Sequence, residues 1–115
     1  MTQQEYCVED CKKCPALVDS RSQIVNGVGP MDSPLVLVGE APGENEDQNG
    51  EPFVGRSGEV LDSELEQNGI SRDAVRITNT VRCRPPDNRD PHKSERNNCF
   101  SYLEEEIAEI DPEVV

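Results

Sequence analysis

The sequence predicts an α/β fold with a parallel sheet that is incomplete at the end of the chain. Two short runs of apolar or β-branched residues alternate with two amphipathic stretches, and a third apolar run has only begun when the chain ends. Elements in this order form parallel strands joined by right-handed crossovers. A glycine-rich loop directly follows the first run, at the place where open α/β sheets bind their ligands.

The strands are predicted where apolar and β-branched residues gather. Leu35–Val38 is a continuous apolar run, typical of a buried strand. Val75–Val81 is rich in β-branched residues and predicts the second strand, and Glu113–Val115 resembles the opening of a third. The three prolines of Cys83–Pro91 exclude regular structure and predict a loop between the second strand and the second helix.

The first helix is predicted over Ser57–Asn68, between the two main strands. Val60, Leu61 and Leu65 share one face of this helix, and Gly69 is expected to end it as a C-terminal cap. The stretch before the first strand shows little periodicity, and no element is predicted there.

The second helix is predicted over Ser94–Ile110, and Asp111-Pro112 ends it. Four apolar residues at helical spacing are expected to belong to the core: Phe100, Leu103, Ile107 and Ile110. The chain is therefore expected to form one domain over residues 1–115, with an N-terminal segment at 1–32 and the alternating strands and helices at 33–115.

Composition limits the class of protein. With 115 residues, 33% hydrophobic and 3% aromatic, the chain has little material for a core. The formal charge of −13 is what we expect on the surface of a halophilic protein, although an acidic mesophilic surface would look similar. No apolar run is long enough to span a membrane and no signal peptide is visible, so we expect a cytoplasmic protein without membrane contact.

The basic residues are concentrated in one stretch. Between residues 72 and 96, seven bases stand against four acids. Such a stretch could bind a polyanion such as nucleic acid, or its bases could pair with neighbouring acids. The bases are Arg72, Arg76, Arg82, Arg84, Arg89, Lys93 and Arg96.

The chain has five cysteines, and metal ligation is the interpretation that fits them best. Thiols stay reduced in the cytoplasm, and an odd number argues against full disulfide pairing. Cys11 and Cys14 form a C-x2-C pair, and Cys83 and Cys99 stand at compatible places. Four thiolates suit either zinc or an iron–sulfur cluster. The single histidine, His92, is expected to be a loop or helix-start residue rather than a ligand.

The loop from Gly39 to Gly55 predicts a binding pocket. Gly39 and Gly43 allow close approach of the backbone to a ligand, Glu40 supplies a carboxylate, and Phe53 offers a flat face for stacking. Taken singly, Phe53 could equally be a core residue and Glu40 a solvated acid.

Several motifs in register resemble the family 4 uracil-DNA glycosylases. They are Gly39-Glu40-Ala41-Pro42-Gly43, Glu46-Asp47, the Gly50 to Gly58 stretch with Pro52-Phe53-Val54-Gly55, Ile77-Thr78-Asn79, and Cys83-Arg84-Pro85-Pro86 with Asn88-Arg89 and Pro91. The resemblance covers essentially the whole chain. It implies a uracil-DNA glycosylase-like three-layer α/β/α fold, an activity in base-excision DNA repair, and uracil-containing DNA as the partner.

The resemblance also implies roles for individual residues in cleaving the N-glycosidic bond of a flipped deoxyuridine. Asn79 would read the Watson–Crick edge of uracil, and Phe53 would stack on its ring. Glu40 would position or activate the attacking water, Glu46 or Asp47 would support that water, and the backbone amide of Ala41 would lie near uracil.

The cysteines match the iron–sulfur ligands of that family, which implies a [4Fe–4S] cluster held by Cys11, Cys14, Cys83 and Cys99. Cys7 is left outside this ligand set. The cluster would be structural and would orient the Arg84–Arg89 loop toward DNA phosphates.

One part of the family pattern has no counterpart in this sequence. The family's second active-site motif is a C-terminal loop with a histidine, and His92 lies elsewhere. We therefore expect a truncated chain, lacking a C-terminal half, with little or no activity alone. The alternatives from other classes are a non-catalytic nucleic-acid-binding module and a zinc-stabilised interaction domain.

Overall fold

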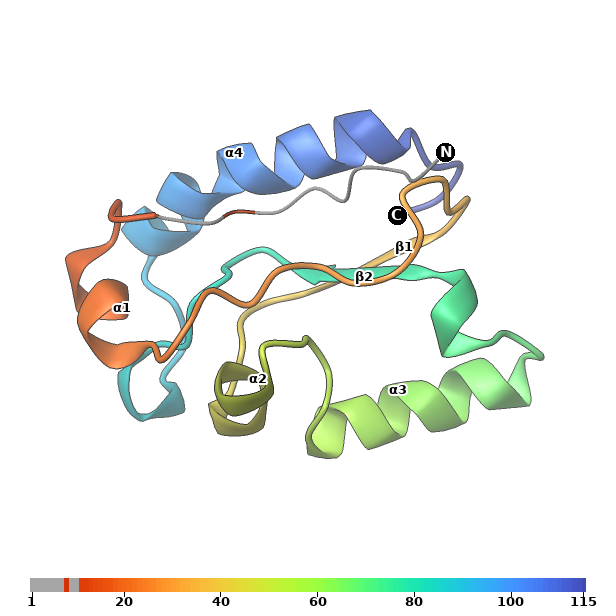
Figure 1. Ribbon diagram of the computed structural model, residues 1–115, viewed down its shortest axis with the longest axis horizontal. Coiled ribbons are helices and arrows are strands. Elements are labelled where there is room, and N and C mark those ends of the chain that lie inside the picture. Colours follow the sequence, from red (N-terminus) through yellow and green to blue (C-terminus); the bar gives the residue numbers. More distant parts are fainter. Residues whose placement is uncertain (1–7, 9–10) are drawn as a thin grey trace.

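A computed structural model describes residue 8 and residues 11–115 of the chain. Cys7 lies outside the described residues. Helices and strands alternate along the chain (Figure 1). In order they are α1 (Pro15–Ser20), β1 (Val36–Gly39), α2 (Glu44–Asn49), α3 (Arg56–Gln67), β2 (Arg76–Asn79) and α4 (Lys93–Ile110), with short 3-10 turns at Arg72–Ala74 and Pro86–Asn88.

The sheet is parallel, as the alternating pattern predicts. β1 and β2 pair in register from Val36 opposite Arg76 to Gly39 opposite Asn79. The predicted third strand is present as a single parallel bridge between Leu35 and Val114, where the Val36 amide donates to the Val114 carbonyl at 3.0 Å. β1 therefore lies between β2 and the residues at the end of the chain, which confirms the incomplete α/β fold.

Helices cover both faces of this sheet. In Figure 1, α4 lies on one side of the strands and α2 and α3 lie on the other. On the α4 side, Val36 packs with Met31 and Ile110. On the α3 side, Ile77 packs with Leu65 and Val75. The alternation of side chains along each strand thus divides a small core between two layers.

The predicted helix boundaries hold to within one residue. α3 ends at a left-handed Gly69, where the Gly69 amide donates to Glu66 and the Ile70 amide donates to Leu65, so the predicted glycine cap is confirmed. His92 is the residue that precedes α4, which is the helix-start position expected for it.

Two residues predicted to face the core are exposed. Val60 is 60% exposed because the buried stripe of α3 runs through Leu65 instead. Phe100 is 49% exposed because the inward face of α4 runs through Cys99, Leu103, Glu106 and Ile110. The apolar spacing is misleading in α4 because a charged residue, Glu106, occupies a core position.

Glu106 is buried because two arginines neutralise it. Arg76 Nη2 lies 2.6 Å from Glu106 Oε2, and Arg82 Nη2 lies 2.6 Å from Glu106 Oε1. All three side chains are at most 1% exposed. A buried carboxylate is tolerated only when it is paired in this way, so the triad fixes α4 against β2 and the residues that follow it.

Two short helices were not predicted. α1 begins directly after Cys14, with a proline in its first turn, where a missing amide costs nothing. α2 has acids in its first turn and ends at a left-handed Gly50. Neither has an apolar stripe long enough to give a periodic signal. In the described part of the chain, no helix is long and apolar enough to cross a membrane.

Candidate active site and cysteine group

A cavity of about 290 Å³ opens where β1 and β2 end. Parallel strands bring their carboxyl ends to one edge of the sheet, which is why loops from both strands meet there. Every residue predicted to act on the base or the water lies in its wall, with the exception of Asp47. The pocket is lined by Gly39, Glu40, Ala41, Glu46, Phe53, Ser57 and Asn79.

Asn79 is the last residue of β2 and is only 3% exposed. No hydrogen bond joins its side-chain amide to any residue that the structure describes, and its atoms are not among the fully enclosed ones without a partner. A buried amide without a partner costs about 1–3 kcal/mol. The amide therefore points into the pocket as a donor and acceptor held ready for a ligand.

Gly39 and Phe53 shape the slot in front of this amide. A Cβ atom added to Gly39 would collide with Asn79 Oδ1 and with the edge of the Phe53 ring. Phe53 has a φ of 56°, a left-handed conformation that costs a non-glycine residue about 1–3 kcal/mol. The ring lines the pocket beside Asn79 and also packs against the Leu65, Val75 and Ile77 cluster.

Glu46 is buried in the pocket wall and its carboxylate is occupied by backbone amides. Gly43 donates to Oε1 at 2.9 Å, while Val54 and Gly55 donate to Oε2 at 3.0 and 2.8 Å. These contacts join the loop after β1 to the residues that begin α3. Glu46 therefore organises the pocket, and the catalytic role that the sequence predicts for it would be exercised from this fixed position.

The Glu40 carboxylate differs from that of Glu46 in its exposure and in its hydrogen bonding. Glu40 is exposed at the mouth of the pocket, and none of residues 8 and 11–115 hydrogen-bonds to its carboxylate. Its backbone carbonyl accepts from the Val81 amide at 2.9 Å, which anchors the loop to the chain after β2. Its carboxylate is thus free to bind water or a ligand.

Asp47 faces away from the pocket. Its carboxylate accepts from the Ser22 amide at 2.8 Å, and its carbonyl accepts from the Gln23 side chain at 2.9 Å. These bonds tie α2 to the residues after α1, so of the two acids only Glu46 lines the pocket.

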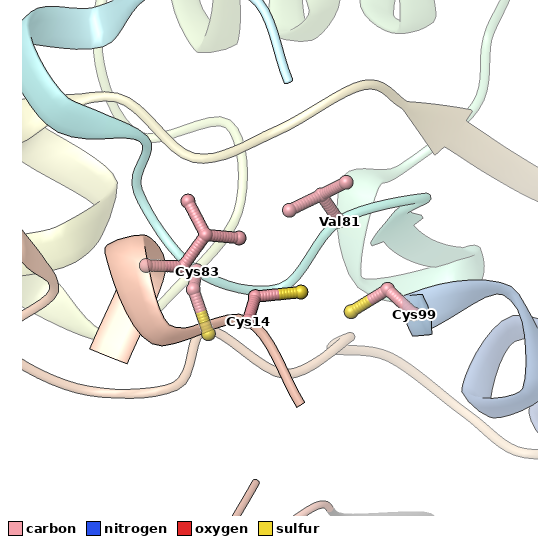
Figure 2. Packing of buried hydrophobic residues seen from close by; sticks show 5 residues of the cluster. Cys14, Val81, Cys83 and Cys99 are labelled. Atoms are coloured by element: carbon pink, nitrogen blue, oxygen red, sulfur yellow. The ribbon is translucent and has the colours of Figure 1, made fainter. Parts of the chain in front are cut away.

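The four cysteines of the C-x2-C pair, Cys83 and Cys99 lie together, and we call them the cysteine group. None is in a disulfide. Figure 2 shows Cys14, Cys83 and Cys99 beside Val81, with the sulfurs of Cys14 and Cys99 pointing toward one another. The group comes from the start of α1, the loop after β2 and α4, and Ala41 of the pocket packs against it.

Side-chain donors surround three of these sulfurs. Arg21 Nη1 donates to Cys83 Sγ at 3.0 Å, the Tyr102 hydroxyl donates to Cys11 Sγ at 3.0 Å, and Asn98 Nδ2 donates to Cys14 Sγ at 3.5 Å. Burial raises the pKa of the Cys99 thiol to about 11, and it also raises the pKa of Cys83.

This environment fits metal-bound sulfur. A neutral thiol is a weak acceptor, whereas a thiolate accepts strongly, so three donors aimed at three sulfurs suit sulfurs that carry negative charge. Burial alone would keep the thiols protonated, and a bound metal would reverse this. No group of three or more metal-binding side chains in the described ranges is already arranged around one metal position.

The comparison with protein families decides what kind of protein this is. The model of the Uracil DNA glycosylase superfamily matches residues 26–115. The chain belongs to this superfamily.

Curated relatives place the chain near the Type-4 branch of the superfamily. It is 44% identical over 108 residues to the Type-4 uracil-DNA glycosylase of Thermotoga maritima, covering 94% of this chain and 56% of that protein. It is 46% identical over 109 residues to the Type-4 enzyme of Sulfurisphaera tokodaii, covering 94% of this chain and 49% of that protein. The chain spans about half the length of these relatives.

The basic stretch of this uracil-DNA glycosylase superfamily member is mostly paired internally. Beyond the two arginines on Glu106, Arg72 pairs with Asp62 at 2.7 Å, and Arg89 donates both terminal nitrogens to Glu95 at 2.8 and 2.9 Å. Four of the seven bases in this stretch therefore form ion pairs with acids of the same chain, as the second interpretation of the stretch predicts.

Four residues of the two regions are not predicted by the sequence: Ser57, Arg21, Asn98 and Tyr102. Ser57 lines the pocket in the first turn of α3, and its motif position next to Gly58 could have suggested it. Arg21 and Tyr102 contact sulfurs from positions that no spacing relates to the cysteines. Only the folded chain brings them there.

Proposed function

We propose that this chain is the uracil-binding part of a Type-4 uracil-DNA glycosylase, which hydrolyses the N-glycosidic bond of deoxyuridine in DNA during base-excision repair. The observation that carries this proposal is the buried, unpartnered amide of Asn79 beside the Phe53 ring. A volume of about 290 Å³ is at the small end for ligand pockets and suits a single-ring base.

Recognition would depend on the two functions of the Asn79 amide. Its nitrogen can donate to uracil O4 while its oxygen accepts from uracil N3–H. Cytosine presents a donor and an acceptor in the opposite places, so an amide kept in the orientation that binds uracil would leave both of its groups unpaired. The Phe53 ring would stack on the flipped base, which must leave the duplex to reach the pocket.

Hydrolysis would use Glu40. Water attacks C1′ of the sugar as the bond from C1′ to uracil N1 breaks, the bonding electrons leave with uracil, and the proton lost by the water passes to the Glu40 carboxylate and from there to solvent. The free carboxylate of Glu40 would orient this water, with Glu46 holding the loop in position. Donors fixed in the pocket, including the Ala41 amide, would stabilise the charge on the leaving uracil.

The proposed cofactor is a [4Fe–4S] cluster held by Cys11, Cys14, Cys83 and Cys99, with zinc as the alternative. It would supply structural crosslinking between the segment before α1, the loop after β2, and α4. That crosslink would orient the Arg84–Arg89 loop toward DNA phosphates. Iron and sulfide analysis of anaerobically purified protein distinguishes the two metals.

The test of the pocket uses binding, because we expect the 115-residue chain alone to release little or no uracil. Amide resonances of the protein are followed by NMR during titration with uracil and with cytosine. Uracil should shift Ala41 and Asn79 at lower concentration than cytosine. Asn79→Ala should lose this preference while keeping the stability of the parent, since the amide makes no internal bond.

Equal response to both bases would refute the proposed pocket. Salt-sensitive binding of single-stranded DNA without any base preference would favour the alternative, a non-catalytic nucleic-acid-binding module. Efficient uracil release by the chain alone would show that the expected loss of activity is wrong.

A further inference from the structure

Arg21 connects two of the segments that carry the cysteines. It directly follows α1, where its amide donates to the Leu17 carbonyl at 2.9 Å. Its guanidinium then donates hydrogen bonds to groups on two different segments of the chain. Nη2 donates to the Cys11 carbonyl at 2.8 Å, and Nη1 donates to Cys83 Sγ at 3.0 Å.

This contact differs in charge from the other two donors. Tyr102 and Asn98 bring neutral groups to Cys11 and Cys14. Arg21 is half-buried and brings a cation that does not lose its proton at any relevant pH. A hydrogen bond between a cation and an anionic sulfur is about twice as strong as a neutral one.

The Arg21 guanidinium lies within hydrogen-bond distance of Cys83 Sγ, at 3.0 Å. A positive charge this close to a sulfur stabilises the anionic form of that sulfur. Arg21 therefore favours negative charge on this sulfur against its apolar surroundings, which include Leu17 and Val81.

The same contact would act on an iron–sulfur cluster held by these cysteines. One-electron reduction adds one negative charge to the cluster, and a fixed cation on a ligand sulfur stabilises the reduced form. Hydrogen bonds to the sulfurs and local charge are the protein's main means of setting the reduction potential of such clusters.

We propose that Arg21 raises the reduction potential of the cluster through Cys83 and holds the Cys11 segment in its ligating position. This rests on the proposed cofactor. Arg21 is thus a positioning residue for the cysteine group, outside both the ligands and the pocket.

The test compares three variants of the loaded protein. Arg21→Gln removes the charge but keeps a neutral donor, and Arg21→Lys keeps the charge but cannot span both partners. The matched control is Lys12→Gln, which removes one charge from an exposed residue that lies between Cys11 and Cys14 in the sequence. Reduction potentials are measured by voltammetry, and cluster content is measured by iron and sulfide analysis and by EPR of the reduced protein.

We expect Arg21→Gln to disfavour the reduced cluster about tenfold, which is a fall in potential of about 59 mV for one electron. Arg21→Lys should fall between it and the parent, and Lys12→Gln should match the parent. Loss of iron from both Arg21 variants, with helical circular dichroism retained and Lys12→Gln fully loaded, also supports the bridging role.

A loaded Arg21→Gln variant with the potential of the parent overturns the inference and leaves the proposed cofactor intact. Parent protein that binds no iron under reconstitution overturns the proposed cofactor, and the inference with it. The iron content of the parent therefore separates the two failures.

Discussion

The pocket and the cysteine group both contact Ala41, but they differ in whether their polar atoms have hydrogen-bond partners. In the pocket, the Asn79 amide and the Glu40 carboxylate have no partner among the described residues. In the cysteine group, three sulfurs receive donors from Arg21, Tyr102 and Asn98. Unpaired groups suit a ligand that comes and goes, whereas surrounded groups suit one that stays with the fold.

The proposed cluster would crosslink three segments of the folded chain, so its binding would contribute to the free energy of folding. Removing one of its ligands should therefore lower the free energy of unfolding more than any other change proposed here. Cys83→Ser is expected to lose bound iron and to lower the free energy of unfolding by on the order of several kcal/mol. Iron content and thermal unfolding measure this. Cys7→Ser is the control, since the resemblance leaves Cys7 outside the ligand set; equal losses in both variants would contradict the assignment.

The buried triad should come next, because it holds α4, and with it Cys99, against β2. Glu106→Gln leaves Arg76 and Arg82 buried without their counter-charge, at a cost of about 3–5 kcal/mol. Urea unfolding measures the loss. Glu104→Gln, an exposed change on the same helix, should stay within about 0.5 kcal/mol of the parent. A similar small loss in Glu106→Gln would show that the triad contributes little.

A change in the shape of the pocket should abolish uracil binding, while it should lower the free energy of unfolding less than the two changes above. Gly39→Ala places a methyl group against Phe53 and Asn79, and we expect a cost of about 1–3 kcal/mol together with loss of the NMR response to uracil. Gly69→Ala serves as the control for glycine replacement, because no atom lies near its added methyl group and only its left-handed backbone is strained. Unchanged uracil binding in Gly39→Ala would mean that the slot is not the base site.

A smaller effect is expected at the start of α4 in acid. The hydrogen bonds from Arg89 lower the pKa of Glu95 to about 2, with a further contribution from the His92 backbone amide and from the nearby His92 side chain. A carboxylate with a depressed pKa stabilises the fold fully above its ordinary value of 4.5 and loses this as pH falls toward 2. Unfolding midpoints between these pH values should therefore fall more steeply for the parent than for Glu95→Gln, and parallel curves would contradict this.

The acidic surface outside both regions should give the smallest effect. If the charge of −13 reflects adaptation to high salt, molar KCl should raise the unfolding midpoint by screening repulsion between the acids. A midpoint that does not rise between low and molar KCl would remove the halophilic hypothesis, which no comparison with relatives addresses.

Much of the fold could be predicted because its signals are local. The β-branched run before Asn79, the apolar run before Gly39 and the Gly69 cap each act through neighbouring residues, and the structure confirms all three elements. The short helices α1 and α2 could not be predicted, since six residues are too few to show a periodic apolar face.

Most of the pocket wall could also be predicted: Gly39, Glu40 and Phe53 from the loop after the first strand, and Ala41, Glu46 and Asn79 from the resemblance to the family 4 uracil-DNA glycosylases. What each acid does there could not. Glu40 lies in the loop after β1 and Glu46 lies six positions later in α2, yet one carboxylate is free and the other accepts three backbone amides, two of them from Val54 and Gly55 beyond α2. Sequence spacing does not show which backbone amides the folded chain brings to a carboxylate.

By itself, the sequence determined the alternation of strands and helices, the metal-binding pattern of the cysteines and most residues of the pocket wall, because periodicity and motif spacing are properties of neighbouring residues. Only the tertiary structure decided that Glu106 is buried between Arg76 and Arg82, and that Arg21 contacts Cys83. These pairings join residues 24 to 62 positions apart. Charge neutralisation inside a protein depends on distance in space, and the chain acquires those distances only when it folds.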